Sequence, residues 1–346
     1  MFFTISKTPC KILLEQHTVG DWIFSTDLGW AVDRSQSGIR LEKGLGNVNC
    51  VLTSDGHDWQ ITTNELRRFP LWRSKSGDTV SNLIVTDNEI HNPHSISHKD
   101  GRLQTHEGHL PTVGDEILAR RTAEEQICET LISQAEDLRD HDRPIIAPNT
   151  HGVDCALVRA VLDYSGIPYT SHGISDQTLD LSRLSGHRFR LYRQMLNDGS
   201  RHTQATGFNG DAFMSRNPMY VSLYLKKWNI DLTAEFDKAG STYMRNSFDK
   251  NYRDKILKYT YPADPMSKLI DMLVNDFQAW HIDECLTWTP LADIRIMKTC
   301  LSIDPETAID QCVNAGLSRA LIKRLSPNRL DEIQRNHNGN EPVRTP

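Results

Sequence analysis

The chain has 346 residues, of which 38% are hydrophobic and 24% charged, a balance that is typical of a folded globular protein and excludes a largely disordered one. Its length predicts about two domains. Acidic side chains outnumber basic ones by 45 to 39, and the net charge of −6 excludes the overall positive field of a dedicated nucleic-acid-binding protein.

The sequence predicts a cytoplasmic protein without a membrane segment. No run approaches about eighteen consecutive apolar residues, and Lys7, Lys11 and Glu15 interrupt the amino-terminal stretch where a secretory signal would be apolar. The seven cysteines are odd in number, widely spaced and without a Cys-x-x-Cys pair. That pattern favours reduced thiols over a disulfide framework or a zinc site.

Short apolar runs alternate with turns from Met1 to Val85 and predict a β-rich first unit. We expect strands in it at 21–25, 29–33, 49–53, 59–63 and 82–85. The segment 91–114 is polar and rich in proline and glycine. We therefore place the connection between the domains there, with the first domain and its connector at 1–109 and the second domain at 110–335.

The second domain begins with a helical pattern from Ile117 to Ala135, which Thr112 or Asp115 would cap. A strand at 144–147, a loop at 148–152, a helix at 153–164 and a strand starting at 167–170 then predict a β-loop-α-β unit of a parallel sheet. Further helices are expected at 266–280, 294–301, 305–315 and 318–325, and a polar tail at 336–346.

The loop between this strand and helix is the segment most informative for function. A helix start that follows a parallel strand presents backbone N–H groups and a positive helix end to an anion such as phosphate. Thr150 and Cys155 carry donors, Gly152 allows close backbone approach, and Asp154 is placed to hold magnesium. An ordinary helix start with an acidic first turn explains Asp154 equally well.

Four segments in order suggest a family. The run Thr-His-Gly-Val-Asp-Cys at 150–155 resembles the Ser-Gly-Gly-x-Asp-Ser pyrophosphate loop of the asparagine synthetase-like enzymes. Thr-Gly-Phe-Asn-Gly-Asp-Ala at 206–212 aligns with their second loop, Ser-Gly-x-Gly-x-Asp-Glu, and Pro-Leu-Ala-Asp at 290–293 resembles their Pro-Leu/Phe-x-Asp region. The stretch 316–324 resembles their Gly-x-x-Lys-x-x-x-Arg helix start.

The resemblance implies an α+β, Ntn-type glutaminase-like sandwich followed by an α/β PP-loop domain of the adenine nucleotide α-hydrolase type, with a helical carboxyl-terminal part. It implies an ATP-dependent ligase that adenylates a small carboxylate, releases pyrophosphate and forms an amide with ammonia or another amine. Magnesium is expected on Asp154 and Asp211. The implied ATP- and pyrophosphate-binding residues are Thr150, His151, Gly152, Val153, Asp154, Cys155, Gly207 and Gly210.

The amino-terminal unit resembles a class II glutaminase at 61–72, but it lacks the nucleophile of that family. In those glutaminases a cysteine that becomes the first residue attacks glutamine, with its own α-amino group as base. This chain has Phe2 and Phe3 at that place. We therefore predict that the protein does not hydrolyse glutamine.

Several positions depart from the family pattern. The first loop has Thr150 and Cys155 where the family has serine, and His151 where it has glycine; the second has Asn209 for glycine and Ala212 for glutamate. These changes are compatible with another substrate or with lost catalysis. An Asn-Gly turn at 209–210 also accounts for Asp211 without a metal.

Two basic residues of the 316–324 stretch are the candidate catalytic cations. Arg319 falls where the family has its transition-state lysine, and Lys323 falls at its arginine. Both can neutralise phosphate charge, although a planar guanidinium does not replace a compact ammonium. A solvated helix face is the alternative interpretation for both.

Five histidines lie within 91–109, at 91, 94, 98, 106 and 109. Imidazoles are good transition-metal ligands, but these spacings match no zinc pattern, so we interpret the segment as a solvated linker.

Two functions of other classes stay open besides the ligase: a catalytically degenerate relative that acts as a binding or assembly module, and a regulator that binds ATP without turnover. We expect no nucleic-acid or membrane partner. The sequence does not define the oligomeric state, and a homodimer is compatible with it.

Overall fold

The structure is a computed structural model that describes residues 3–7, 13, 15–26, 30–35, 38–45, 48–63, 71–81, 88–90, 94–106, 116–139, 144–149, 151–173, 203–207, 210–238 and 287–333. The chain divides into a first unit, residues 1–111 with 274–286, and a second unit, residues 112–273 with 287–346. The predicted strand at 82–85, helix at 266–280 and tail at 336–346 lie outside the described residues.

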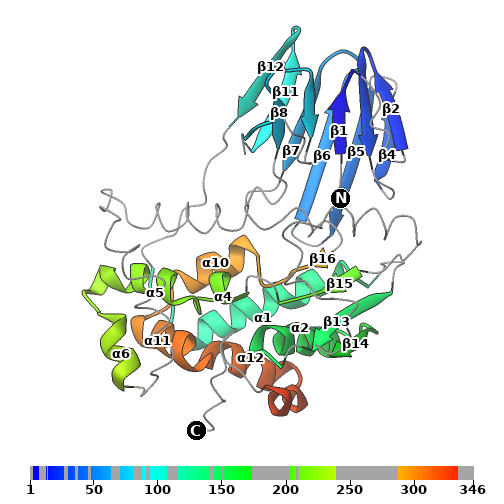
Figure 1. The fold of residues 1–346 in the computed structure, drawn as a ribbon. Helices are drawn as coiled ribbons and strands as arrows, with labels where there is room; N and C mark the ends of the chain where they lie inside the picture. Colours follow the sequence, from blue (N-terminus) through cyan, green and yellow to red (C-terminus); the bar gives the residue numbers. More distant parts are fainter. Residues whose placement is uncertain are drawn as a thin grey trace. The chain divides into compact units, whose positions relative to one another are not determined.

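The first unit contains two antiparallel six-stranded sheets (Figure 1). One has the strand order β10 (Asn88–Ile90), β8 (Trp72–Ser74), β9 (Thr79–Ser81), β1 (Phe3–Ser6), β3 (Trp22–Thr26) and β2 (Glu15–Val19). The other has the order β12 (Arg102–His106), β11 (Ser95–Lys99), β7 (Trp59–Thr63), β6 (Val48–Ser54), β5 (Gly38–Leu45) and β4 (Ala31–Ser35).

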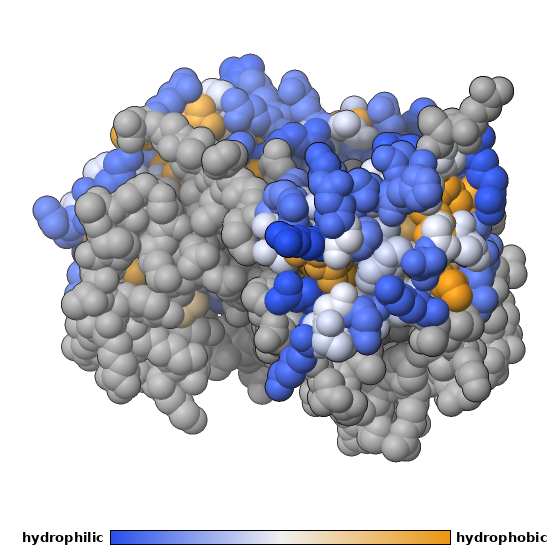
Figure 2. Space-filling view, turned by 90° about the horizontal axis from the view of Figure 1, so that it is seen from above, coloured by the Kyte–Doolittle hydropathy of each residue, from blue (hydrophilic) through white to orange (hydrophobic). Residues whose placement is uncertain are grey.

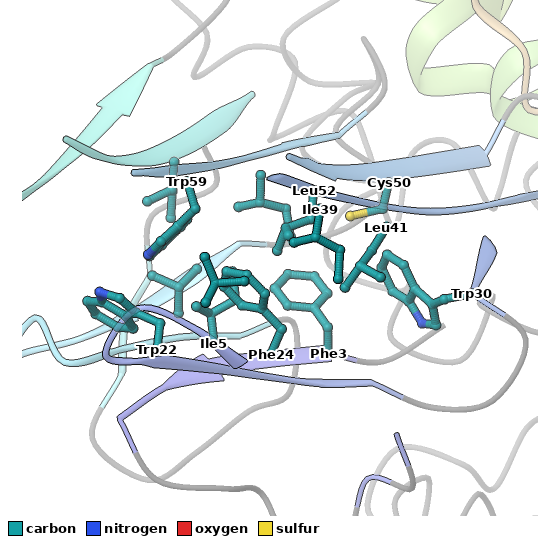
Figure 3. Packing of buried hydrophobic residues seen from close by; sticks show 14 of the residues in the cluster. Phe3, Ile5, Trp22, Phe24, Trp30, Ile39, Leu41, Cys50, Leu52 and Trp59 are labelled. Carbon is teal, nitrogen blue, oxygen red and sulfur yellow. The ribbon is translucent and has the colours of Figure 1, made fainter. Parts of the chain in front are cut away.

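A hydrophobic core lies between these two sheets (Figure 3). Along β7 the burial alternates, because successive side chains of a strand point to opposite faces. Phe24 of one sheet meets Trp59 of the other edge to face, with ring centroids 6.1 Å apart. Each large side chain buried in this way contributes about 1.5–3 kcal/mol. The alternating strands of the sequence therefore form a β-rich unit, as predicted, and in the structure it has two sheets.

The hairpin of β11 and β12 corrects one prediction. Residues 94–106 were expected to belong to a solvated linker, but Ser95 and Ile96 are buried and β11 pairs with both β7 and β12. The turn between the strands uses Asp100 and Gly101, which both have positive φ. The strand pattern was hidden because most residues of the hairpin are polar and because its buried residues are confined to the start of β11.

The second unit contains a parallel four-stranded sheet and helices (Figure 1). The strand order is β14 (Thr170–Gly173), β13 (Ile145–Asn149), β15 (Thr203–Ala205) and β16 (Thr287–Trp288). The helices are α1 (Arg120–Glu136), α2 (Val153–Tyr164), α4 (Gly210–Phe213), α5 (Pro218–Leu225), α6 (Leu232–Lys238), α10 (Ile294–Cys300), α11 (Pro305–Asn314) and α12 (Gly316–Leu325), with short 3-10 turns η3 (Lys226–Trp228) and η5 (Pro327–Glu332).

The β-loop-α-β prediction is confirmed in this unit, except that β13 covers Ile145–Asn149 and not 144–147. Helix α2 has the predicted ends, whereas β14 begins at Thr170 rather than at Ile167. Helix α1 begins at Arg120, because Leu118 is paired with Ile303 in a parallel bridge and with Ser302 through a backbone hydrogen bond. This pairing to a distant segment has no local signal in the sequence.

The chain leaves β13 toward β14 on one side, whereas β15 lies on the other side of β13. Strand order therefore reverses at β13, and the crevice outside the carboxyl ends of β13 and β15 is the place where open α/β sheets bind ligands. Both loops singled out in the sequence follow these two strands. The topology thus brings them to the same edge of the sheet.

The described residues visible in Figure 2 are mostly hydrophilic, and the hydrophobic ones form small separate groups. Large hydrophobic side chains that are exposed in the described part of the chain are Val32, Ile117 and Tyr164. No helix of the described residues is long and apolar enough to cross a membrane.

Candidate functional site

The first loop is built by a strand that ends directly before a helix. β13 ends at Asn149, and α2 begins at Val153 with the extended Gly152 as its N-cap. The side-chain oxygen of Asn149 accepts a hydrogen bond from the backbone N–H of His151 at 3.2 Å. The positive end of α2 therefore lies at the carboxyl edge of the parallel sheet. Thr150 lies outside the described residues.

His151 has φ +56°, in the left-handed region that favours glycine. The Nδ1 atom of His151 is buried and has no hydrogen-bond partner. His151 therefore combines a strained backbone with a buried polar atom that has no hydrogen-bond partner.

The second loop packs directly against the first turn of α2. A Cβ atom at Gly207 would lie 2.5 Å from the carbonyl carbon and the Cβ atom of Asp154. At Gly210 it would lie 2.8 Å from the carboxyl group of Asp154 and 2.5 Å from Leu291. Such distances are shorter than real Cβ contacts. At Gly207 the obstacle is the backbone and Cβ of Asp154, so only glycine fits there, whereas at Gly210 side-chain ends would have to move. The two glycines bring the two predicted loops together at Asp154.

Asp154 forms an ion pair that the sequence did not predict. The Nη2 atom of Arg216 lies 3.0 Å from Oδ2 of Asp154, and the side chain of Arg216 is 3% exposed. Burial raises the pKa of Asp154 to about 6; the positive charge of Arg216 opposes the rise, and the negative charge of Asp211 adds to it. The two predicted metal-binding aspartates are therefore close enough to interact electrostatically.

Asp154, Asp211 and Arg216 form what we call the Asp154 cluster. Several polar atoms of this cluster are buried without a hydrogen-bond partner. They are Oδ1 of Asp154 and the Nε and Nη1 atoms of Arg216. Buried polar groups are normally paired, so orphaned atoms on both sides of an ion pair indicate a site for a polar ligand. The unpaired carboxylate oxygen of Asp154, near a second carboxylate, fits the oxygen ligands that magnesium prefers.

The candidate catalytic cations differ in their surroundings. Arg319, in α12, is half-buried, and burial together with the charge of Arg216 lowers its pKa. Lys323 is exposed in the last turn of the same helix. Arg319 therefore lies in the electrostatic field of the Asp154 cluster, whereas Lys323 faces solvent.

The other residues of the first loop divide by burial. Val153 is buried in the core and Cys155 is half-buried. A buried valine contributes to the site only through its backbone. Any side-chain contact between this turn and a ligand must come from the residues next to Val153.

Asp293, the aspartate of the Pro-Leu-Ala-Asp segment, has a structural role. It is 1% exposed and caps α10 by accepting a hydrogen bond from the backbone N–H of Arg295 at 2.6 Å. Its other carboxylate oxygen accepts from the side chain of Gln134 at 2.9 Å, which ties α10 to α1. Asp293 thus holds α10 and α1 together.

A cavity of about 490 Å³ lies at the opposite end of α2. Its charged side chains satisfy one another: Arg329 pairs with Asp163 at 2.7 Å and donates to the hydroxyl of Tyr169 at 2.8 Å. None of the described residues that line this cavity has a buried side-chain polar atom without a hydrogen-bond partner, in contrast to the Asp154 cluster.

The histidine-rich segment gives no metal site among the described residues. His98 stacks on Trp59 with ring centroids 5.9 Å apart, and His106 hydrogen-bonds to Ser97 at 3.0 Å. No group of three or more potential ligands occurs in the described part of the chain.

Arg216 is the residue that sequence reasoning missed. It follows Asp211 by five residues and is preceded by Phe213 and Met214. A cation in such an apolar surrounding was the available signal, because a buried arginine requires a partner.

Comparisons with known proteins add no family: no protein-family model matches the chain, and no curated protein matches it. The geometry of the site therefore carries the functional argument.

Proposed function

We propose that the second unit is a PP-loop ligase of the asparagine synthetase-like kind, which uses ATP to adenylate a small carboxylate for amide formation and releases AMP and pyrophosphate. The observation that carries this proposal is the meeting of two loops at one sheet edge. They bring two carboxylates, Asp154 and Asp211, together with the cation Arg216, and Arg319 of α12 interacts electrostatically with Arg216. In the same proposal the first unit is an Ntn-type sandwich without glutaminase activity.

The chain's own residues would divide the work on the phosphates. The amino terminus of α2 directs its positive end to the sheet edge, which favours an anionic ligand there. Arg319 provides a positive charge for the pyrophosphate as it leaves. Gly207 and Gly210 hold the second loop close enough for both loops to contact one ligand.

Asp154 and Asp211 would hold magnesium, which as a Lewis acid would neutralise negative charge on the phosphates. Asp154 is mostly ionised at pH 7, because its pKa is about 6. Arg216 orients Oδ2 of Asp154, so that Oδ1 is left for the ion. Arg216 thus has a positioning role.

The amine would come from outside the first unit. The proposal takes the first unit to have no glutaminase activity, so free ammonia or an external amine is the acceptor in it.

One experiment tests the proposal: conversion of radiolabelled ATP to AMP, with pyrophosphate release, against a panel of amino acids and small carboxylates with ammonium present. Asp154→Ala is compared with Glu129→Ala, a change of an exposed carboxylate on α1. Carboxylate-dependent AMP formation that is lost in Asp154→Ala and kept in Glu129→Ala supports the ligase. Unchanged turnover in Asp154→Ala contradicts it.

One observation favours a second function, the catalytically degenerate binding or assembly module. Arg216 pairs with the carboxylate that would hold the metal, and Ala212 removes a carboxylate from the second loop. Absence of AMP formation with every carboxylate of the panel would support this module in place of the ligase.

A further inference from the structure

Arg216 has more hydrogen-bonding capacity than the protein uses. Its backbone is fixed on both sides: the N–H donates to the carbonyl of Asp211 at 2.8 Å, and the carbonyl accepts from the Sγ atom of Cys312 at 3.6 Å. In the side chain, Nη2 pairs with Asp154, whereas Nε and Nη1 are buried without partners. A guanidinium carries five N–H donors in a rigid planar fork, and a buried fork used only at one nitrogen is incompletely satisfied.

The charged groups around Arg216 come from three neighbouring elements. Asp154 is on α2, Asp211 is on α4 and Arg319 is on α12. Arg216 is close enough to Arg319 to disfavour the positive charge of the latter. Two neighbouring arginines repel each other, and an anion that contacts both would remove that repulsion.

We propose that Arg216 is a phosphate-binding residue, which keeps Nη2 on Asp154 and donates Nε and Nη1 to oxygens of the ATP phosphate chain or of released pyrophosphate. The inference rests on the proposed function and deepens it, since it adds a residue that contacts the substrate. Asp154 then acts on both partners: one oxygen orients the guanidinium, and the other is available to magnesium. Arg216 and Arg319 hold the anion from two elements of the second unit.

The fork shape of the side chain gives the inference a specific test. Arginine binds phosphate through two parallel N–H donors, whereas lysine offers a point charge. Arg216→Lys keeps the charge beside Asp154 and removes the paired donors. A residue that only neutralises Asp154 would tolerate this change without an effect on anion binding.

The experiment is a calorimetric titration of the full chain with inorganic pyrophosphate and, separately, with ATP, each with and without magnesium. The variants are Arg216→Lys and Asp154→Asn, with Arg121→Lys as the control because Arg121 is 90% exposed and paired only on the surface. Unfolding curves without ligand establish that each variant is folded. For Arg216→Lys we expect magnesium-free pyrophosphate binding to weaken by roughly tenfold or more, because charge-assisted paired hydrogen bonds are lost.

Asp154→Asn separates the two proposals. It should keep magnesium-free pyrophosphate binding within about threefold, since Arg216 remains, and lose the gain from magnesium. If Arg216→Lys does not fold, the double variant Asp154→Asn with Arg216→Gln replaces the whole ion pair by neutral groups. That double variant should bind magnesium-free pyrophosphate as weakly as expected for Arg216→Lys.

Two results would overturn the inference. Wild-type affinity for pyrophosphate in Arg216→Lys, or in the double variant, would reduce Arg216 to a counter-ion of Asp154 and leave the proposed function intact. Failure of the wild-type chain to bind either pyrophosphate or ATP would overturn both proposals together.

Discussion

Replacement of Asp154 by asparagine should change how the stability of the second unit depends on pH. Burial raises the pKa of this carboxyl group from its ordinary value of 3.8 to about 6. The folded protein therefore binds the proton more tightly than the unfolded chain does, and stability falls as pH rises from about 4 to about 6. Asparagine has no proton to lose, so this pH dependence disappears in Asp154→Asn.

The magnitude follows from the two pKa values. At 1.36 kcal/mol per pH unit, the full difference between acidic and alkaline conditions is about 3 kcal/mol. Between pH 5 and pH 8, where the protein is easier to handle, it is about 1.4 kcal/mol, since the unfolded chain is already almost fully ionised at pH 5 and the remainder has been lost below that pH. Asp154→Asn should not lose this stability as the pH rises.

Urea unfolding at pH 5 and pH 8, followed by the circular dichroism of the helices, measures this effect, because all helices of the described residues lie in the second unit. The stability difference between the variant and the wild type should shift by about 1.4 kcal/mol in favour of the variant from pH 5 to pH 8. Other titrating groups cancel in this comparison. A difference that stays constant over this range would refute a buried, proton-binding Asp154.

Further substitutions test the two loops and the cap of α10. His151→Gly should raise the free energy of unfolding by about 0.5–1 kcal/mol in thermal unfolding, because residue 151 has positive φ; His151→Ala, which retains the strain, should not. Gly207→Ala should lower the free energy of unfolding by about 2 kcal/mol or more, since the new Cβ meets Asp154. In the control Gly166→Ala the new Cβ meets no atom within 4 Å, and backbone strain should lower the free energy of unfolding by only about 1 kcal/mol. Equal losses would contradict the close approach of Gly207 to Asp154. Asp293→Ala should cost about 2 kcal/mol in urea unfolding by removing a helix cap and a buried acceptor, and an unchanged midpoint would contradict that role.

The strand–loop–helix unit could be predicted from the sequence because its signals are local. The apolar face of α2 recurs at helical spacing, and Pro144 and Gly166 mark where the helices before and within the unit end. The place of Asp154 in the first helical turn follows from the same pattern. These local signals place the first loop of the candidate site and Asp154 within it.

The remaining features depend on contacts between distant segments. Arg216 reaches Asp154 across 62 positions of the sequence. The hairpin at 94–106 was not recognised because its buried side depends on pairing with β7. The strain at His151 arises from the path between β13 and α2. Such features follow from tertiary packing, which composition and periodicity do not encode.

Calorimetric titration of the chain with ATP in magnesium tests whether the two loops beside Asp154 form a nucleotide site. We expect saturable one-to-one binding that weakens at least about tenfold without magnesium and in Asp211→Asn, while Glu129→Gln binds as the wild type does. No binding up to about 10 mM ATP, or binding indifferent to magnesium and to Asp211, would contradict it.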